Sequence, residues 1–401
     1  MGRIALCGGR VIDGRGNVIE NCRVGIEGSR ISSITQGDGG PDSGADDTID
    51  VGGKTLLPGL IDCHVHLCLD GGPDPVKASN ETPDTWILLN SARNARMTIE
   101  AGVTTVRDAG GKNFVNILLR DALKDKLVLG PRMISCGRMI CMTGGHGWTF
   151  GGREADGALE VKKAVREQIK MGADFIKVMA TGGVLTEGRE PGATQLSYEE
   201  LEIAVLEAKH ANRRTASHAL GTDGIKNSIR AGVDSIEHGV YLDRESIDML
   251  VDKGTILVPT LSPPVKILEC RRNMPVAKYL VERMESVIDI HRRSVLGAFE
   301  NNVKIGMGSD AGMPCNPHGD NLRELEELVK LGLSPMDAII SSTSLAAEAL
   351  GLSEEIGTLE PGKLADLVVI DGNPLENICV FREKERITYV MREGEVVVEN
   401  S

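Results

Sequence analysis

The sequence predicts an α/β protein, a (β/α)8 barrel of the TIM type with a small β-sandwich-like domain built from both chain termini. Three observations lead to this prediction. Glycine is unusually frequent, at 48 of 401 residues. Short apolar runs recur along the chain, separated by segments of helical character, and both ends of the chain show a different, alternating pattern. Alternating strands and helices are typical of a parallel barrel, and a doubly wound open sheet is the competing architecture.

Several glycines stand between a helix-like segment and a short apolar run. Gly102 precedes VTTVRD, Gly172 precedes ADFIKVM, Gly232 precedes VDSIEH and Gly254 precedes TILVPT. Glycine readily takes the left-handed conformation that closes a helix. A parallel strand buried on both faces reads as a continuous apolar run. The glycine excess therefore indicates repeated helix-to-strand turns.

The segments before these glycines have helical patterns. Residues 158–171 place apolar side chains mostly at i, i+3 and i+4 spacing, with charges between them. Residues 197–210 begin with Ser197 and, three positions later, Glu200, which is a capping box. Both segments are predicted to be helices.

Eight apolar runs are predicted as the barrel strands, and their number favours a closed barrel over an open sheet. The runs are 57–67, 104–108, 132–137, 174–179, 215–219, 235–238, 256–261 and 303–310. We assign residues 57–356 to the barrel. Residues 1–56 and 357–401 are assigned to one composite small β domain, because both read as short alternating segments with turns.

Composition excludes several classes of protein. The net charge is −13 and only 11 residues are aromatic, which argues against a basic or stacking surface for nucleic acid. No run approaches the ~20 apolar residues of a membrane span. The amino-terminal segment lacks the apolar run of a signal peptide, so we expect a cytoplasmic protein with no membrane partner.

The nine cysteines are odd in number and scattered, without a C-x-x-C pair. This usage predicts reduced thiols packed in the core and neither a disulfide framework nor a zinc finger. They are Cys7, Cys22, Cys63, Cys68, Cys136, Cys141, Cys270, Cys315 and Cys379.

Metal-ligating residue types gather where the predicted strands end, which is where a barrel places its function. His64 and His66 are two residues apart, so their side chains share one face of the first strand and can reach one metal ion. His218, His238 and Asp310 end three later strands. A single such histidine would more often be structural. This concentration predicts a metal site.

Lys177 interrupts the otherwise apolar fourth strand. An inward ammonium would have to be desolvated, which costs several kcal/mol. One interpretation pairs Lys177 with an acidic neighbour such as Asp310. The other is reaction of its neutral amine with CO2, which gives a carbamate and releases a proton; the carbamate oxygens could then bridge two metal ions.

The strand-end residues, in this order on a predicted barrel, resemble the amidohydrolase superfamily. The resemblance covers nearly the whole chain and includes KTLLPGLIDCHVHL near the front and GTLEPGKLADLVVIDGNP near the back. It implies a binuclear centre of two divalent metal ions, bridged by carboxylated Lys177. Zn fits the ligand types best, with Mn, Fe or Co as alternatives. The implied ligands are His64, His66 and Asp310 for one ion and His218 and His238 for the other.

Two such ions would generate a bridging hydroxide that attacks an amide carbonyl. Asp310 would accept its proton and pass it to the leaving amine. A purely ligating role for Asp310 is the alternative, and both roles can hold together.

Substrate contacts are expected on the loops that follow the strands. The glycine-rich loop 142–150 suits a lid, and its His146 could hydrogen-bond the substrate. Tyr241 could be a second donor to the carbonyl, with a core tyrosine as the alternative. Three further loop residues could bind a carboxylate: Arg153, Arg189 and His318.

Four segments, TTVRDAGG, TGGHG, IKVMATGG and SIEHGVYLD, resemble the imidazolonepropionase-related branch, which includes metal-dependent dipeptidases. We therefore expect hydrolysis of the amide bond of a dipeptide or an N-acyl amino acid by a homo-oligomer. A cyclic amide hydrolase, of the imidazolonepropionase or hydantoinase type, is the alternative. A catalytically silent scaffold is a third hypothesis, and the intact ligand positions argue against it.

Overall fold

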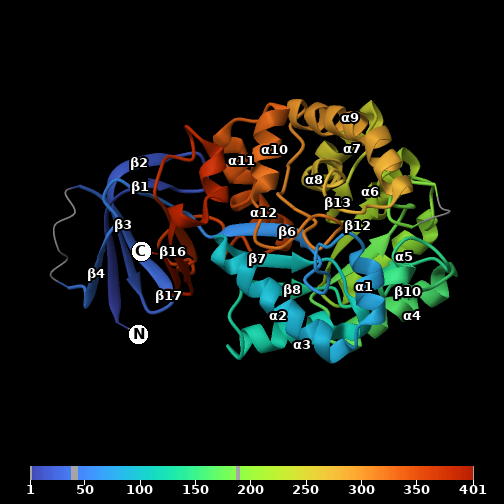
Figure 1. The fold of residues 1–401 in the computed structure, drawn as a ribbon, viewed down its shortest axis with the longest axis horizontal. Helices are drawn as coiled ribbons and strands as arrows, with labels where there is room; N and C mark the ends of the chain where they lie inside the picture. Colours follow the sequence, from blue (N-terminus) through green and yellow to red (C-terminus); the bar gives the residue numbers. More distant parts are fainter. Residues whose placement is uncertain (1, 38–43, 187–189, 401) are drawn as a thin grey trace.

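Seven parallel strands of a TIM-type barrel surround one axis, with helices outside them (Figure 1). The structure is a computed structural model and describes residues 2–37, 44–186 and 190–400. The strands form two runs, β6-β7-β8 and β11-β12-β13-β14, and each pair within a run is parallel. This confirms the predicted fold class. The barrel strands are β6 (Leu60–Val65), β7 (Val103–Asp108), β8 (Arg132–Ser135), β11 (Phe175–Met179), β12 (Arg214–Ala219), β13 (Ser235–His238) and β14 (Ile256–Val258).

The eighth position of the barrel is irregular. The predicted strand 303–310 is wrong as a continuous strand: in the described chain this segment makes isolated bridges, Leu257 with Ile305 and Val65 with Ala311. These bridges still join β14 to β6 and close the barrel. The segment passes close to β14 at Gly308, where a Cβ would lie 2.4 Å from the Val258 side chain. Asp310 then adopts a φ of 54°, which ends the extended run.

Two short strands add to the rim between β8 and β11. They are β9 (Ile140–Cys141) and β10 (Arg153–Glu154), which pair in parallel. Between them lies the predicted lid loop, with a short 3-10 turn at Trp148–Phe150.

The helices follow the strands as predicted. Gly102, Gly172, Gly232 and Gly254 all have positive φ values where a helix turns into a strand. The capping box at Ser197 is present, with both reciprocal bonds to Glu200. The helices are α1 (Pro75–Glu81), α2 (Asp84–Glu100), α3 (Val115–Lys124), α4 (Gly157–Lys170), α5 (Tyr198–His210), α6 (Thr222–Ala231), α7 (Arg244–Lys253), α8 (Ser262–Cys270), α9 (Lys278–Glu300), α10 (Arg323–Leu331), α11 (Pro335–Ser341) and α12 (Ser344–Leu350).

Both chain ends meet in one branched sheet beside the barrel (Figure 1). The first strand pairs with one neighbour along Ile4–Cys7 and with another along Arg10–Val11, so the sheet folds around a separate apolar core. The predicted boundary at residue 56 falls inside a strand of this sheet. The strands are β1 (Arg3–Ile12), β2 (Val18–Glu27), β3 (Arg30–Gln36), β4 (Asp47–Asp50), β5 (Thr55–Pro58), β15 (Leu367–Ile370), β16 (Ile387–Arg392) and β17 (Glu395–Glu399).

Charged contacts tie this sheet to the barrel. Arg132 of β8 pairs with Asp366 and, at 2.8 Å, with Glu393. Lys126 pairs with Glu395 of β17 at 2.7 Å. The terminal sheet is therefore fixed against the β8 side of the barrel.

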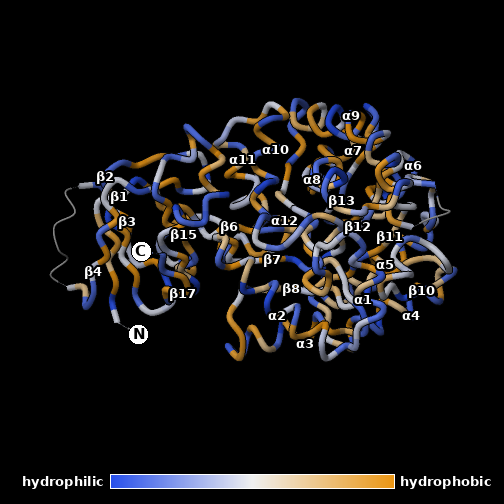
Figure 2. The backbone as a smooth tube through the Cα atoms, viewed as in Figure 1, coloured by the Kyte–Doolittle hydropathy of each residue, from blue (hydrophilic) through white to orange (hydrophobic). Residues whose placement is uncertain are grey.

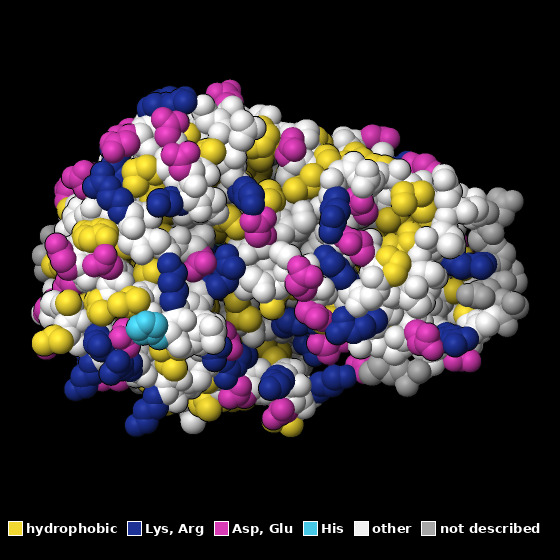
Figure 3. Space-filling model, turned by 180° about the vertical axis from the view of Figure 1, so that it is seen from behind, with side chains coloured by type: hydrophobic (Ala, Val, Ile, Leu, Met, Phe, Trp, Pro, Cys, Tyr) yellow, Lys and Arg dark blue, Asp and Glu magenta, His cyan; other side chains and the backbone are white. Residues whose placement is uncertain are grey.

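The outer surface is polar and mixed in charge. Hydrophilic and hydrophobic residues alternate along the outer helices (Figure 2). Basic and acidic side chains intermingle on the face in Figure 3. Among the helices described, none has both the length and the apolar composition of a membrane span.

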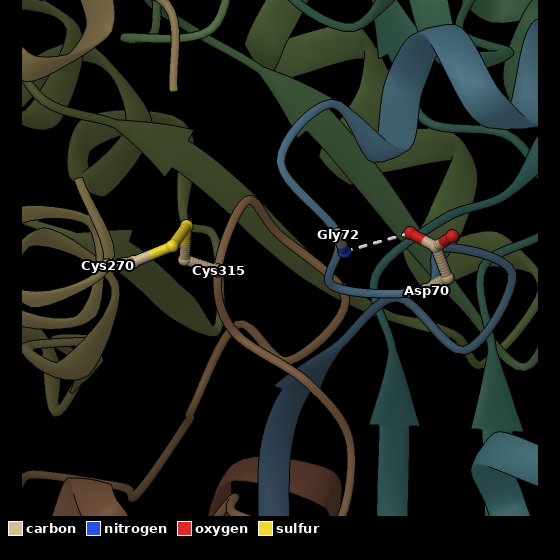
Figure 4. The surroundings of a disulfide bond; sticks show 4 residues. All are labelled: Asp70, Gly72, Cys270 and Cys315. Carbon is tan, nitrogen blue, oxygen red and sulfur yellow. Dashed lines mark hydrogen bonds between the residues drawn. A yellow bond between two sulfur atoms is a disulfide. The ribbon is translucent and has the colours of Figure 1, made fainter. Parts of the chain in front are cut away.

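Two of the nine cysteines were wrongly predicted as free thiols. Cys270, at the end of α8, is bonded to Cys315, five residues after Asp310 (Figure 4). The backbone N–H of Cys315 donates to the Gly72 carbonyl, 3.1 Å away. The two cysteines are 45 positions apart in the sequence, and their proximity depends on where α8 packs.

Candidate active site

The predicted strand-end residues surround one cavity at the carboxyl ends of the barrel strands. The cavity holds about 740 Å³ of empty space, part of it open to solvent. Its polar lining residues are almost all buried. The predicted ligands that line it are His64, His66, Lys177, His218, His238 and Asp310.

His64, His66 and Asp310 form a compact candidate metal-binding cluster. The Nε2 atoms of both histidines lie 3.5 Å from Asp310 Oδ1. Such separations allow one cation to contact all three side chains. The two rings come from the i, i+2 pair at the end of β6, as the alternation of a strand requires.

The Nδ1 atoms of these histidines are occupied by other groups. His64 Nδ1 lies 2.7 Å from Glu237 Oε2, and His66 Nδ1 lies 2.8 Å from the Gly110 carbonyl oxygen. Both partners are acceptors, so the Nδ1 atoms carry the proton and donate. The Nε2 lone pairs then face the cavity. Histidine ligands of metal ions are commonly oriented in this way.

Three further histidines stand beside this cluster. The His218 ring centroid lies 4.5 Å from that of His238 and 4.4 Å from that of His146. His238 Nδ1 is 2.7 Å from the Thr260 hydroxyl. The later strands therefore bring a second group of imidazoles to the same cavity.

Three polar atoms of the predicted ligands are buried and, within the described chain, make no hydrogen bond: Lys177 Nζ, His218 Nε2 and Asp310 Oδ1. The interpretation that pairs Lys177 with Asp310 is therefore not confirmed. Buried polar atoms without partners are rare, and they indicate an unseen ligand or ion. Imidazole, carboxylate and amine donors around one space fit a divalent transition metal.

Burial shifts the titration of the cavity groups. It lowers the pKa of Lys177 to about 8 and raises the pKa of Asp310 to about 7, although Lys177 opposes the latter shift. Burial also lowers the pKa of His64 to about 4 and holds the pKa of His218 well below its usual range. The imidazoles are thus neutral at pH 7, the form in which histidine binds metal ions.

Backbone strain is concentrated around the same residues. His238, Thr260 and Asp310 have φ values of 73°, 53° and 54°. The His238 carbonyl accepts a bond of 2.9 Å from His291 Nε2, and the Asp310 N–H donates to the His64 carbonyl at 2.7 Å. Non-glycine residues keep such conformations only where the surroundings enforce them, typically at functional sites.

A buried ionic network behind His64 was not predicted. Arg107 donates to Glu237 at 2.6 Å, and the Ser235 hydroxyl donates to the same carboxylate oxygen. Burial alone would raise the pKa of Glu237, but Arg107 and Lys177 hold it well below its usual range. Glu237 therefore stays ionised and orients His64. The signal in the sequence was a charged residue in each of two short buried strands.

Asp62 forms a second buried hydrogen-bond network, which joins β6 to the eighth segment. Its carboxylate accepts from the Ser309 hydroxyl at 2.5 Å, from Asn321 at 2.9 Å and from the His64 N–H at 3.1 Å. It lies two residues before His64 on the same face of the strand. The network fixes the backbone on either side of the cluster.

His146 lies at the cavity, as predicted. Its Nδ1 is 2.9 Å from the Thr186 hydroxyl, and its ring packs against Gly183. A Cβ at Gly183 would lie 2.3 Å from His146 Nε2, so only glycine leaves room for the ring. Phe150 of the same loop also lines the cavity.

The other predicted substrate contacts are not brought to the described lining of the cavity. Tyr241 packs against Gly192, and its role as a carbonyl donor stays a prediction. Arg153 pairs with Glu167 at 2.6 Å. His318 Nε2 bonds the backbone carbonyls of His66 and Leu69, and His318 does not line the cavity, so its carboxylate contact stays a prediction. Arg189 lies outside the described residues.

Known proteins are similar to this chain in sequence and in fold. A crystal structure of a Xaa-Pro dipeptidase with bound methionine in the active site is 33% identical and superposes with a TM-score of 0.90, over 99% of this chain and 100% of that one. Ochratoxinase of Aspergillus niger is 33% identical over 370 residues, 85% of this chain and 75% of its own length.

More distant relatives include the imidazolonepropionase of Rhizorhabdus wittichii, 27% identical over 361 residues, which are 80% of each chain. These similarities place the chain near the dipeptidase and imidazolonepropionase branch, as the four sequence segments indicated. Residues 55–397 match the amidohydrolase family. The chain belongs to the amidohydrolase family.

Proposed function

We propose that this protein is a metal-dependent hydrolase that cleaves the amide bond of a dipeptide or an N-acyl amino acid. One observation carries the proposal: oriented neutral imidazoles, a buried carboxylate and a buried lysine surround one cavity, and several of their atoms have no partner among the described residues. A divalent cation held there supplies Lewis-acid activation of a carbonyl and of water.

His64, His66 and Asp310 would hold one cation, and His218 and His238 a second. Zn suits this donor set best. Glu237 and the Gly110 carbonyl keep the first two imidazoles oriented, which spares the site any reorganisation on binding. These anchors support a site built for ligation.

Lys177 would bridge the two cations as its carbamate. Support comes from its burial at 2% exposure and from the lack of a hydrogen-bond partner for Nζ in the described chain. Carbamylation replaces a buried cation with an anion that two cations can pair with. The cations would in turn pair with His218 Nε2 and Asp310 Oδ1, which have no partner in the described chain.

Asp310 would move the proton. Its carboxylate lies beside both cluster imidazoles, within reach of water or of an amide nitrogen in the cavity. It would accept a proton during attack and return it to the leaving amine. His146, on the lid loop, would donate to the substrate carbonyl, and its place in the cavity lining supports this role.

A dipeptide-like substrate is supported by the similarity to a Xaa-Pro dipeptidase. The imidazolonepropionase relative favours a cyclic amide as the second candidate. Both reactions use the same metal-facing groups, so the shape of the cavity must discriminate between them.

The test is a substrate screen on metal-stripped protein before and after reloading with Zn. We expect reloaded protein to hydrolyse dipeptides or N-acyl amino acids and stripped protein to be inactive. Hydrolysis of imidazolones or hydantoins alone would refute the first candidate in favour of the second. Activity that survives complete metal removal would refute both.

A further inference from the structure

The cavity has a polar side and an apolar side. The polar side carries the predicted ligands. The rest of the lining is largely built from aliphatic and thioether side chains that come from the loops and helices after β11, β12, β13, β14 and the eighth segment. We call these residues the apolar wall: Val184, Leu220, Val240, Ile267, Met284, Val287 and Met313.

Helix α9 gives the apolar wall much of its surface. Met284 and Val287 line the cavity at i and i+3 on this helix, and His291 follows one turn further on the same face. Ile267 of α8 packs in the same apolar cluster. The Cys270–Cys315 disulfide joins α8 to the segment that carries Met313. The wall is therefore a packed surface and not a chance exposure.

The described lining offers no spare charge on this side. Beyond the groups assigned to ligation and His146, its polar side chains are Thr260 and His291. Both are engaged with His238, one at Nδ1 and the other at the carbonyl oxygen. Arg283 of α9 donates to the Val184 and Thr186 carbonyls. A charged substrate side chain placed against the wall would lose its water and gain no partner.

We infer that the apolar wall is a subsite for an uncharged, apolar side chain of the substrate. The inference rests on the proposed function and narrows it. Apolar side chains gain by burial against such a surface, while an unpaired charge is excluded. Among dipeptides and N-acyl amino acids, those with lysine, arginine or acidic side chains at the wall are therefore poor substrates.

The first test compares substrates on the intact, Zn-loaded protein. Dipeptides and N-acyl amino acids carry Met, Gln, Glu or Lys in turn at each position, because these side chains have similar lengths. We expect kcat/KM for Met to exceed that for Gln by about 10-fold or more at one position, and to exceed that for Glu and Lys further. Equal rates for Met, Glu and Lys at both positions would overturn the inference. Hydrolysis of no amide at all would instead refute the proposed function.

A binding measurement separates recognition from turnover. Calorimetry on the Zn-loaded protein compares hexanoate with 6-aminohexanoate and with adipate, whose tails end in a charge. We expect hexanoate to bind at least about 10-fold more tightly than either. Equal affinity for all three would contradict an apolar subsite.

Val287→Asp places a carboxylate on the wall and should reverse the preference, lowering kcat/KM for Met substrates and raising it for Lys substrates. Leu159→Asp is the matched control, because Leu159 is 83% exposed on α4, outside the cavity, and should change neither. Should Val287→Asp fail to fold, Met284→Gln replaces it and should reduce the preference for Met over Gln. An unchanged preference in a folded wall variant would overturn the assignment.

Discussion

The polar and apolar sides of the cavity are held in place by different forces. On the polar side single hydrogen bonds orient several of the rings, such as the 2.7 Å contact between His64 and Glu237. On the apolar wall no single contact dominates, and Ile267 and Val287 keep their places by packing in a shared cluster. The orientation of a hydrogen-bonded ring is lost when its one partner is removed, whereas packed apolar surfaces tolerate hydrophobic substitutions that conserve volume.

We therefore expect that different residues of this chain determine the reaction and the substrate preference. Changes on the polar side should affect metal binding or turnover for every substrate. Changes on the wall should affect which substrates are used. The following predictions test that separation, from the largest expected effect to the smallest.

Asp310→Asn should lower kcat by about 10²- to 10⁴-fold, because the amide cannot accept a proton. Its metal content should fall less than that of His64→Ala, since the amide oxygen can still contact a cation. Steady-state kinetics and elemental analysis of both variants provide the measurement. Equal metal loss in the two variants would remove the support for a proton-transfer role.

Lys177→Ala should lose the bridging group and with it most bound metal and activity. Added short carboxylic acids, such as acetate or propionate, should restore part of both by occupying the space of the carbamate. Full metal content and full activity without any addition would rule out the carbamate.

Glu237→Gln should weaken metal binding by about 10- to 100-fold, because the anchor of His64 is altered. It also leaves Arg107 buried without its counter-ion, which destabilises the fold by about 3–5 kcal/mol. Glu355→Gln is the control, since Glu355 pairs with Arg30 in an ion pair that is 48% exposed on both sides. Identical metal affinity in both variants would show that Glu237 does not act on His64.

Cys270→Ser should have the smallest effect on the metal centre. The disulfide closes a loop of 45 positions, so chain entropy predicts a loss of up to about 4 kcal/mol in the free energy of unfolding. Urea unfolding measures this loss, and elemental analysis should show unchanged metal content. Loss of metal in a folded Cys270→Ser protein would show that the two sides of the cavity are coupled.

The fold and the polar side could be predicted because buried polar residues are conspicuous in a sequence. Lys177 interrupts a strand that otherwise reads as apolar, and His64 and His218 stand near the ends of theirs, where strand geometry fixes which way they face. The helix-closing glycines indicated the repeated helix-to-strand unit. The eighth strand was overestimated, because bridges at Ile305 and Ala311 cannot be told from a continuous strand by composition. The predicted first strand, 57–67, also joined the end of β5 to β6.

The apolar wall, the disulfide and the buried ionic network behind His64 could not be predicted from residue types along single strands. Val287 and Ile267 look like any core residues, and only the packing of α8 and α9 turns them toward the cavity. Cys270 and Cys315 meet because of that same packing. Arg107 and Glu237 come from different strands, so their pairing depends on barrel register.

Metal titration tests the central claim most directly. Chelator-stripped protein is reloaded with increasing Zn while bound metal per chain and hydrolysis of a Met-containing dipeptide are followed together. We expect activity to be absent without metal and to rise until two ions are bound per chain. His218→Ala should bind fewer than two ions per chain. Hydrolysis that is independent of bound metal would contradict the central claim.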